Sequence, residues 1–159
     1  MQDLTIDLDG GRLNCRAGGI IIHNGKALFH RNTADTYYAL VGGRVQIFES
    51  SEETVKREIE EEIGKKVEII GYIATIENFF NAKNKNYHEI LFVHQAEFVH
   101  ENDKKITETL QNIEKNKEVH IQYEWLDVNK LDEYDIRPSV IKDILKNGKY
   151  PTHIINKGK

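Results

Sequence analysis

The densest group of residues able to do chemistry is a run of glutamates between positions 49 and 62. Seven glutamates fall in this stretch. On a helix that turns ~100° per residue, Glu61 and Glu62 lie about 60° to one side and 40° to the other side of Glu58, so these three carboxylates project from one face. Grouped carboxylate oxygens are the ligands that hard divalent cations prefer. The spacing predicts a Mg²⁺ site, which Mn²⁺ would also occupy, that binds a phosphorylated substrate.

Local physics disfavours such a helix. Like charges three or four residues apart repel by roughly 0.2 to 0.5 kcal/mol per pair, and acids in the last turn oppose the helix dipole by ~0.3 to 1 kcal/mol each. A segment that breaks local rules this heavily often marks a functional site. The alternative is a solvated acidic face whose charge is compensated by nearby basic residues. These are Lys56, Arg57, Lys65 and Lys66.

The acidic stretch carries clear signals for a helix over residues 51–63. Ser50 followed by Glu53 fits a capping box, and Gly64 suits the position just after a helix. An apolar residue recurs every four positions between these signals, as expected for one buried face. These residues are Val55, Ile59 and Ile63. The stripe adjoins the three carboxylates, which we therefore expect at the edge of the core.

The remaining elements are mostly strands. Asn24-Gly25 predicts a tight turn within a β-hairpin over 13–31, and Gly42-Gly43 permits a sharp turn or a close approach to a ligand after a strand at 37–41. Further strands are expected at 67–75, 87–99 and 119–126, a loop or weak helix at 100–117, and a helix from Pro138 that Gly148 ends. Strands outnumber helices and do not alternate with them, which favours an α+β fold or mixed-sheet sandwich over a doubly wound one.

Composition limits the class of protein. A length of 159 residues favours one domain spanning 1–159. The balance of 22 Lys and Arg against 26 Asp and Glu gives a net charge of −4, which argues against a stable nucleic-acid complex. The single cysteine, Cys15, excludes an internal disulfide and a multi-cysteine metal site. No signal sequence or membrane span is evident, so we expect a cytoplasmic protein that does not enter the membrane.

The residues from Gly43 to Lys65 resemble the Nudix box, G-x5-E-x7-R-E-U-x-E-E-x-G-U, where U is a bulky aliphatic residue. The matching positions are Gly43, Glu49, Arg57, Glu58, Ile59, Glu61, Glu62 and Gly64. Lys65 departs from the aliphatic pattern, and Val41 stands where family members often have proline. The resemblance to the Nudix hydrolase family (MutT-like pyrophosphohydrolases) implies an α/β/α sandwich around a mixed β-sheet. It also implies that metal-activated water attacks a phosphorus of a nucleoside diphosphate linked to another moiety.

The resemblance also implies roles for individual residues. Glu58, Glu61 and Glu62 would be metal ligands, together with the backbone carbonyl of Gly43 or Gly42. Arg57 and Glu49 would form a supporting pair, although a surface ion pair of little worth is the alternative. Family members take the general base either from the box or from a distant loop, so Glu58 and Glu118 are both candidates.

Residues that select the substrate must lie outside the box. Aromatic side chains stack on nucleobases, and arginines contact phosphate or ribose. The aromatic candidates are Tyr37, Tyr38, Phe79, Phe80 and Tyr87, and the basic candidates are Arg16, Arg31 and Arg44. Most strand aromatics belong to a core, so we expect only one or two of them to touch substrate.

Three classes of function explain the acidic helix. The first is a hydrolase for a nucleotide such as ADP-ribose, a nucleoside triphosphate, a dinucleoside polyphosphate or a capped RNA end. The second is a Nudix-fold sensor that binds a nucleotide without cleaving it, although such proteins would be expected to lose box glutamates. The third, a protein-interaction domain, does not explain the Gly43, Glu49 and Arg57 spacing. An exposed strand edge or residues 3–8 could pair with a second copy of the chain to form a homodimer.

Overall fold

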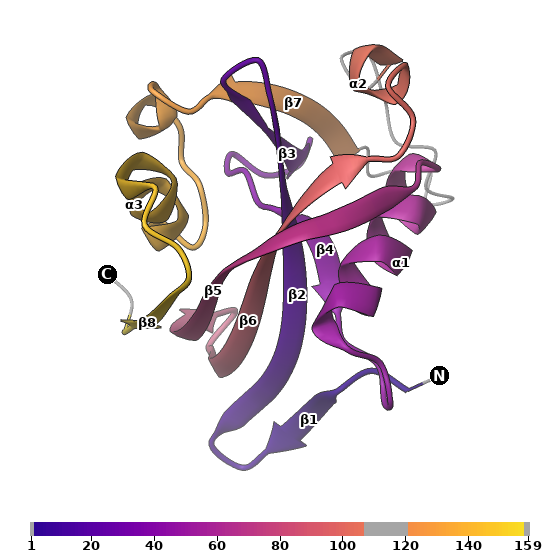
Figure 1. Ribbon diagram of the computed structural model, residues 1–159. Helices are drawn as coiled ribbons and strands as arrows, with labels where there is room; N and C mark the ends of the chain where they lie inside the picture. The colour runs from indigo at the N-terminus through magenta and orange to yellow at the C-terminus, as the bar shows by residue number, and fades with distance from the viewer. Residues whose placement is uncertain (1, 107–120, 158–159) are drawn as a thin grey trace.

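The chain folds around a mixed β-sheet, shown in Figure 1 in the computed structural model, which describes residues 2–106 and 121–157. The strands are β1 (Thr5–Leu8), β2 (Gly11–His23), β3 (Lys26–Asn32), β4 (Val41–Arg44), β5 (Val67–Ala82), β6 (Lys85–Phe98), β7 (Ile121–Asp127) and β8 (Thr152–Asn156). Their order is β7-β3-β2-β6-β5-β8, and β1 and β4 also pair with β2. Strand β2 runs parallel to β6, and β5 runs parallel to β8, whereas the other pairs between these strands are antiparallel.

The helices of the described residues are α1 (Ser51–Ile63), α2 (Asp103–Ile106) and α3 (Val140–Asn147), with a short 3₁₀ turn at Leu131–Glu133. The bounds of α1 and the position of α3 confirm the predictions for these two helices. None of the described helices has the length and apolar character needed to cross a membrane.

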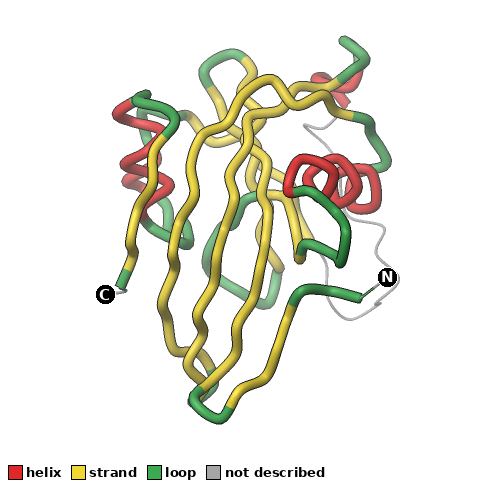
Figure 2. Tube along the Cα trace, turned by 60° about the horizontal axis from the view of Figure 1, so that its bottom comes forward, coloured by secondary structure: helices red, strands yellow, loops and turns green. Residues whose placement is uncertain are grey.

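Helices α1 and α3 cover opposite faces of the sheet, as Figures 1 and 2 both show. On the α1 side, buried side chains of the helix pack against β2, β5 and β6. They are Val55, Ile59 and Ile63. On the α3 side, three buried helix residues pack against the other face of the same strands. They are Ile141, Ile144 and Leu145. The two cores confirm an α+β fold with an α/β/α sandwich around a mixed sheet.

The predicted capping of α1 is present at both ends. The Ser50 hydroxyl accepts a hydrogen bond from the Glu53 backbone N–H, and the Glu53 carboxylate accepts one from the Ser50 N–H. At the other end Gly64 adopts the left-handed conformation with φ 74° and donates its N–H to the Glu60 carbonyl. These contacts use backbone groups that a helix end would otherwise leave unpaired.

The Gly42-Gly43 pair lies inside strand β4 and does not form a turn. The two glycines pair with Gly18 and Ala17 of β2. A Cβ atom on Gly42 would lie 2.1 Å from the Ala17 carbonyl oxygen, so only glycine allows the backbones to approach this closely. The expected strand at 37–41 is correspondingly wrong, because β4 begins at Val41 and only isolated bridges precede it.

Other differences from the sequence-based expectations concern strand ends. Strand β5 continues to Ala82 and meets β6 through a turn at Lys83-Asn84, where both residues have positive φ. Strands β1 and β8 were not expected, and the expected strand at 119–126 corresponds to β7. The segment expected as a loop or weak helix includes α2, and its remainder from residue 107 lies outside the described residues.

Candidate active site

Arg57 is the centre of a hydrogen-bond network on helix α1. Its Nε donates to Glu49 Oε2 at 2.6 Å and its Nη2 donates to Glu49 Oε1 at 2.9 Å. The same Nη2 donates to the Arg44 carbonyl at 3.0 Å. Glu49 also accepts bonds from the Gln46 N–H and the Thr54 hydroxyl. Hydrogen bonds from Arg57 lower the pKa of Glu49 to about 2, so this carboxylate stays ionised.

Glu58 lies directly against β4. A Cβ atom on Gly43 would sit 2.3 Å from Glu58 Oε1 and 2.8 Å from Oε2, so the glycine leaves a space that the carboxylate fills. Arg57 Nη1 donates to Glu58 Oε1 at 2.9 Å. Burial raises the pKa of Glu58, and the Arg57 hydrogen bond opposes this rise.

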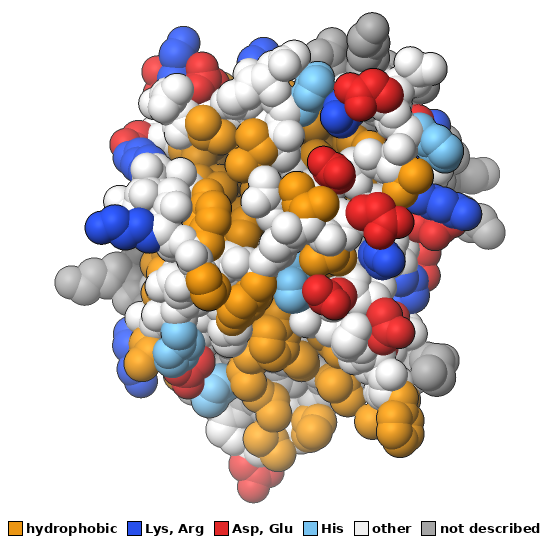
Figure 3. All heavy atoms as spheres, in the orientation of Figure 1, with side chains coloured by type: hydrophobic (Ala, Val, Ile, Leu, Met, Phe, Trp, Pro, Cys, Tyr) orange, Lys and Arg blue, Asp and Glu red, His pale blue; other side chains and the backbone are white. Residues whose placement is uncertain are grey.

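The other two box glutamates differ in exposure. The Glu61 side chain is 59% exposed and accepts a hydrogen bond from Arg57 Nη1 at 3.3 Å. The Glu62 side chain is only 7% exposed, and its Oε1 lies 3.6 Å from His30 Nδ1. Burial and the charge of Arg16 lower the pKa of His30 to about 4, so this imidazole is neutral near pH 7. Figure 3 shows acidic side chains gathered along α1.

The donor set fits a hard divalent cation in its chemistry. It offers carboxylate oxygens held at one face of a helix, and the cradle at Gly43 brings the β4 backbone next to Glu58. Among the described residues, no three His, Cys, Asp or Glu side chains are already grouped closely enough to hold a metal ion. Arg57 Nη1 donates hydrogen bonds to both Glu58 and Glu61. A cation bound by both carboxylates would therefore have to displace this nitrogen, whereas Arg57 Nε and Nη2 would keep their bonds to Glu49.

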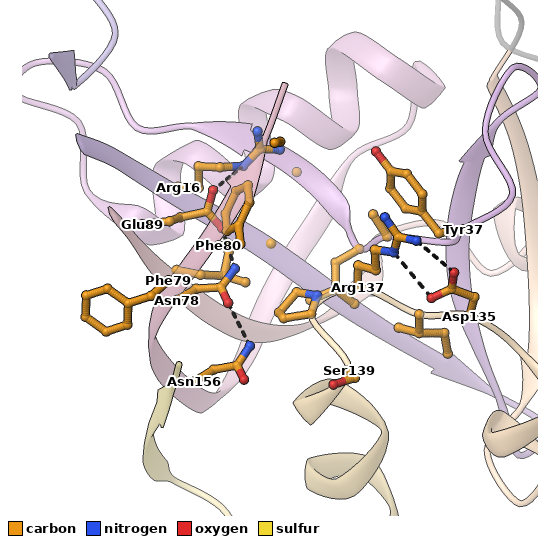
Figure 4. A pocket seen from close by; sticks show the side chains of 18 of the residues that line it. Arg16, Tyr37, Asn78, Phe79, Phe80, Glu89, Asp135, Arg137, Ser139 and Asn156 are labelled. Atoms are coloured by element: carbon orange, nitrogen blue, oxygen red, sulfur yellow. Dashed lines mark hydrogen bonds and ion pairs between the residues drawn. The ribbon is translucent and has the colours of Figure 1, made fainter. Parts of the chain in front are cut away.

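A cavity of about 810 Å³ opens beside this network, between β2, the β5–β6 hairpin and the segment that leads into α3. Four of the sequence-predicted substrate residues line it, together with Gly42, the residue just before the box. They are Arg16, Tyr37, Phe79 and Phe80. Figure 4 shows that Phe80 points into the cavity, whereas Phe79 points away from it. The alternation of side chains along a strand explains this difference.

The remaining predicted substrate residues lie away from the cavity. Arg31 Nη2 donates to Gln122 at 3.0 Å, and its guanidinium lies 5.6 Å from the Tyr38 ring centroid. Arg44 Nη1 lies 3.8 Å from Asp3. Tyr87 stacks on Phe80 with ring centroids 4.9 Å apart and lines a second cavity of about 710 Å³ at the end of the hairpin. Glu118 lies outside the described residues.

The cavity also contains polar residues that the sequence analysis did not select. Asn78 on β5 and Glu89 on β6 face each other across the strand pair, and Asn156 of β8 donates to Asn78 Oδ1 at 2.8 Å. Arg137 lies over the Tyr37 ring, 4.4 Å from its centroid, and pairs with Asp135. The signal in the sequence was that Glu89 and Asn78 interrupt strand faces that are otherwise apolar. This signal can be interpreted only when the register of the two strands is known.

Comparison with known proteins gives a family match over most of the chain. The family model described as the NUDIX domain matches residues 13–146. A search of curated proteins found no match. In all, 214 chains in solved structures resemble this fold. The three described next share too little sequence with this chain to show more than the fold.

A crystal structure of a UDP-X diphosphatase superposes with a TM-score of 0.60 at 18% identity, covering 89% of this chain and 66% of that chain. An ADP-ribose pyrophosphatase from Streptococcus suis gives a TM-score of 0.60 at 14% identity, covering 89% and 98% of the two chains. A MutT protein from Methanosarcina mazei gives 0.58 at 20% identity, covering 89% and 95%. With the box residues assembled on α1 and β4 and the family model matched from residue 13 to 146, this chain belongs to the Nudix family of pyrophosphohydrolases.

Proposed function

We propose that the chain hydrolyses a pyrophosphate bond in a nucleoside diphosphate linked to another moiety, such as a nucleotide sugar or a nucleoside triphosphate, with Mg²⁺ as its cofactor. One observation carries the proposal. Gly42 lines the cavity and the next residue, Gly43, contacts Glu58 of the acidic helix. A nucleoside in the cavity therefore has its diphosphate beside the carboxylates of α1.

Glu58, Glu61 and Glu62 would hold the metal, with the backbone carbonyl of Gly43 or Gly42 as a further ligand. When bound, the cation neutralises phosphate charge and lowers the pKa of a water molecule that attacks phosphorus. Without a bound cation the diphosphate would be repelled by the carboxylates. Mn²⁺ would substitute because it takes similar oxygen ligands.

The chain's own residues position these groups. Arg57 fixes Glu49 through two hydrogen bonds and ties α1 to the Arg44 carbonyl, so it holds the helix against β4. Arg16 lies 3.9 Å from Glu89. Its charge opposes the rise that burial causes in the pKa of Glu58 and adds to the fall that burial causes in the pKa of His30. It therefore stands between the cavity and the acidic helix, where a phosphate would be bound. The general base is either Glu58 or Glu118.

The test is hydrolysis of a nucleotide panel by the purified protein with Mg²⁺ and with EDTA. The panel contains ADP-ribose, a UDP-sugar, the common nucleoside triphosphates and a dinucleoside polyphosphate. Release of nucleoside monophosphate or phosphate with Mg²⁺ alone supports the proposal. Tight binding of one member without cleavage supports the sensor alternative and contradicts hydrolysis.

Two further expectations remain predictions. Residues 1–159 are expected to act as one domain on a small nucleotide. A homodimer would use the outer edge of β1, which is exposed at Ile6 and Leu8 (55% and 62%). Unpaired strand edges of this kind are able to pair with another chain. Size-exclusion chromatography with light scattering tests the expected homodimer, and a strictly monomeric protein would contradict it.

A further inference from the structure

A row of polar side chains crosses five strands beneath the cavity. In the register of the sheet, each residue lies opposite the next one on the neighbouring strand. The row runs from β1 to β8 through Thr5, Asn14, Glu89, Asn78 and Asn156. Its three central members are almost fully buried, since Asn14, Asn78 and Glu89 are 4%, 6% and 7% exposed. Buried polar groups in a sheet are costly unless they are hydrogen-bonded.

The ends of this row are satisfied, and its centre is not. The Thr5 hydroxyl donates to Asn14 Oδ1, and Asn156 Nδ2 donates to Asn78 Oδ1. Glu89, in contrast, accepts one long bond from Asn78 Nδ2 at 3.4 Å and lies 3.9 Å from Arg16 Nε. No other hydrogen bond reaches its carboxylate within the described part of the chain. A carboxylate has about four acceptor positions, so most of this capacity is unused.

The unused carboxylate lies at the wall of the cavity. Glu89 and Asn78 both line it, and Figure 4 shows their side chains grouped with those of Arg16 and Phe80. Phe80 lies two residues after Asn78 on the same face of β5, and its ring stacks on Tyr87 with an interplanar angle of 1°. The cavity thus offers a flat aromatic surface next to a carboxylate that accepts only one long hydrogen bond from the described residues. Burial also raises the pKa of Glu89, as expected for a carboxylate removed from water.

We propose that Glu89 selects the substrate by accepting two adjacent hydrogen bonds from its nucleoside, while Phe80 provides the stacking surface. The proposal rests on the proposed function, because it assigns the cavity to the nucleoside of the hydrolysed nucleotide. A carboxylate matches a pair of parallel donors in a fork geometry. A nucleoside presents such a pair in two places, the N1–H and N2–H groups of guanine and the cis-diol of ribose.

The experiment compares the binding of four nucleoside monophosphates by calorimetry in the presence of Mg²⁺, because a monophosphate has no pyrophosphate bond to cleave. The probes are GMP, IMP, AMP and 2′-deoxy-GMP. All four carry the same phosphate, so its interaction with the box cancels in their affinity ratios. If guanine supplies the donors, GMP binds about tenfold tighter than IMP and AMP, and deoxy-GMP binds as well as GMP. If ribose supplies them, the three ribonucleotides bind alike and deoxy-GMP binds about tenfold more weakly.

The substitution Glu89→Gln removes one acceptor with little change in shape and should abolish whichever preference the wild type shows. Glu77→Gln is the matched control, because Glu77 lies on the opposite face of β5 and pairs with His153 outside the cavity. Equal affinity of the wild-type protein for all four probes overturns the proposal even if the variant does not fold. A folded Glu89→Gln variant that keeps the wild-type preference overturns it as well.

The two proposals fail in different ways. If the protein binds nucleotides selectively through Glu89 and yet cleaves none of them with Mg²⁺, that result contradicts only the proposed hydrolysis. Cleavage by a protein whose binding shows no preference contradicts the role of Glu89 alone.

Discussion

Arg57 binds Glu49 through two hydrogen bonds, from Nε to Oε2 at 2.6 Å and from Nη2 to Oε1 at 2.9 Å, across eight residues of sequence. Glu49 lies before the helix and Arg57 within it, so the pair joins the incoming chain to the middle of α1. A third bond, to the Arg44 carbonyl, extends this link to β4. The paired side chains therefore fix the acidic helix relative to the Gly42-Gly43 backbone.

Replacing Arg57 by lysine should impair this link. Lysine carries the charge but lacks the planar fork needed to bind both oxygens of Glu49. We expect the rate of nucleotide hydrolysis to fall by about 10- to 100-fold, as for other residues that orient metal ligands. Steady-state kinetics with Mg²⁺ measure the effect. Lys56→Ala is the control, because this neighbouring side chain points to solvent and lies 3.8 Å from Glu68. A variant R57K with wild-type kinetics contradicts the assigned role.

Substituting Gly43 by alanine should displace Glu58. The added methyl group would lie 2.3 Å from Glu58 Oε1, which no side chain tolerates without movement. Weaker divalent-metal binding and slower hydrolysis should follow, with little loss of helix content by circular dichroism. Gly10→Ala is the matched control, since no atom beyond its two chain neighbours lies within 4 Å of a Cβ at that position. Equal metal affinity in the two variants would show that the close contact at Gly43 has no role in the site.

The N-terminal cap of α1 gives a prediction on stability. Ser50→Ala removes the side-chain bond to the Glu53 N–H and should lower the free energy of unfolding by about 1 kcal/mol. Ser139 precedes α3 but makes no side-chain capping bond, so Ser139→Ala should leave stability almost unchanged. Urea unfolding of both variants provides the comparison. Similar losses in the two proteins would contradict the capping argument.

His94 predicts how stability depends on pH. This residue is 6% exposed, and its Nε2 lies 2.8 Å from Ser51 Oγ at the start of α1. Burial lowers its pKa below 6.5, while the charge of Glu52 opposes this shift and the Tyr72 ring packs beside the imidazole. The unfolded chain therefore takes up a proton first as the pH falls through 6.5, and stability is lost from there down to the lowered pKa of the folded state.

The measurement is the difference in unfolding free energy between pH 8 and pH 5. His94→Gln retains a polar side chain that does not titrate, so the variant should lose less stability in acid than the wild type. Identical losses in the two proteins would exclude His94 as a source of the pH dependence.

Local signals in the sequence were sufficient for helix α1 and for the turn at Asn24-Gly25. Ser50, Glu53 and Gly64 act on neighbouring backbone groups, and the four-residue apolar spacing repeats within a single helix, so no distant contact is needed to interpret them. The box also identified Glu58 and Arg57 by spacing alone. Their common placement on α1 follows from the same local regularity.

Features that depend on contacts between distant segments were not predictable in this way. Gly42 and Gly43 permit a close approach of β4 to β2 and to Glu58, and sequence alone did not separate this from a turn. The partnership of Asn78 and Glu89 exists only in the register of β5 and β6. That register also decides that Phe80, and not Phe79, points into the cavity.

The most direct test of the central claim is a Mn²⁺ titration followed by electron paramagnetic resonance, which measures free and bound ion. Wild-type protein and the control Glu60→Gln, an exposed glutamate of the same helix, should bind Mn²⁺ with the same affinity. The double variant Glu61→Gln/Glu62→Gln should bind it at least about tenfold more weakly, because two proposed ligands lose their charge. Unchanged Mn²⁺ binding by the double variant would contradict the claim that these carboxylates form the metal site.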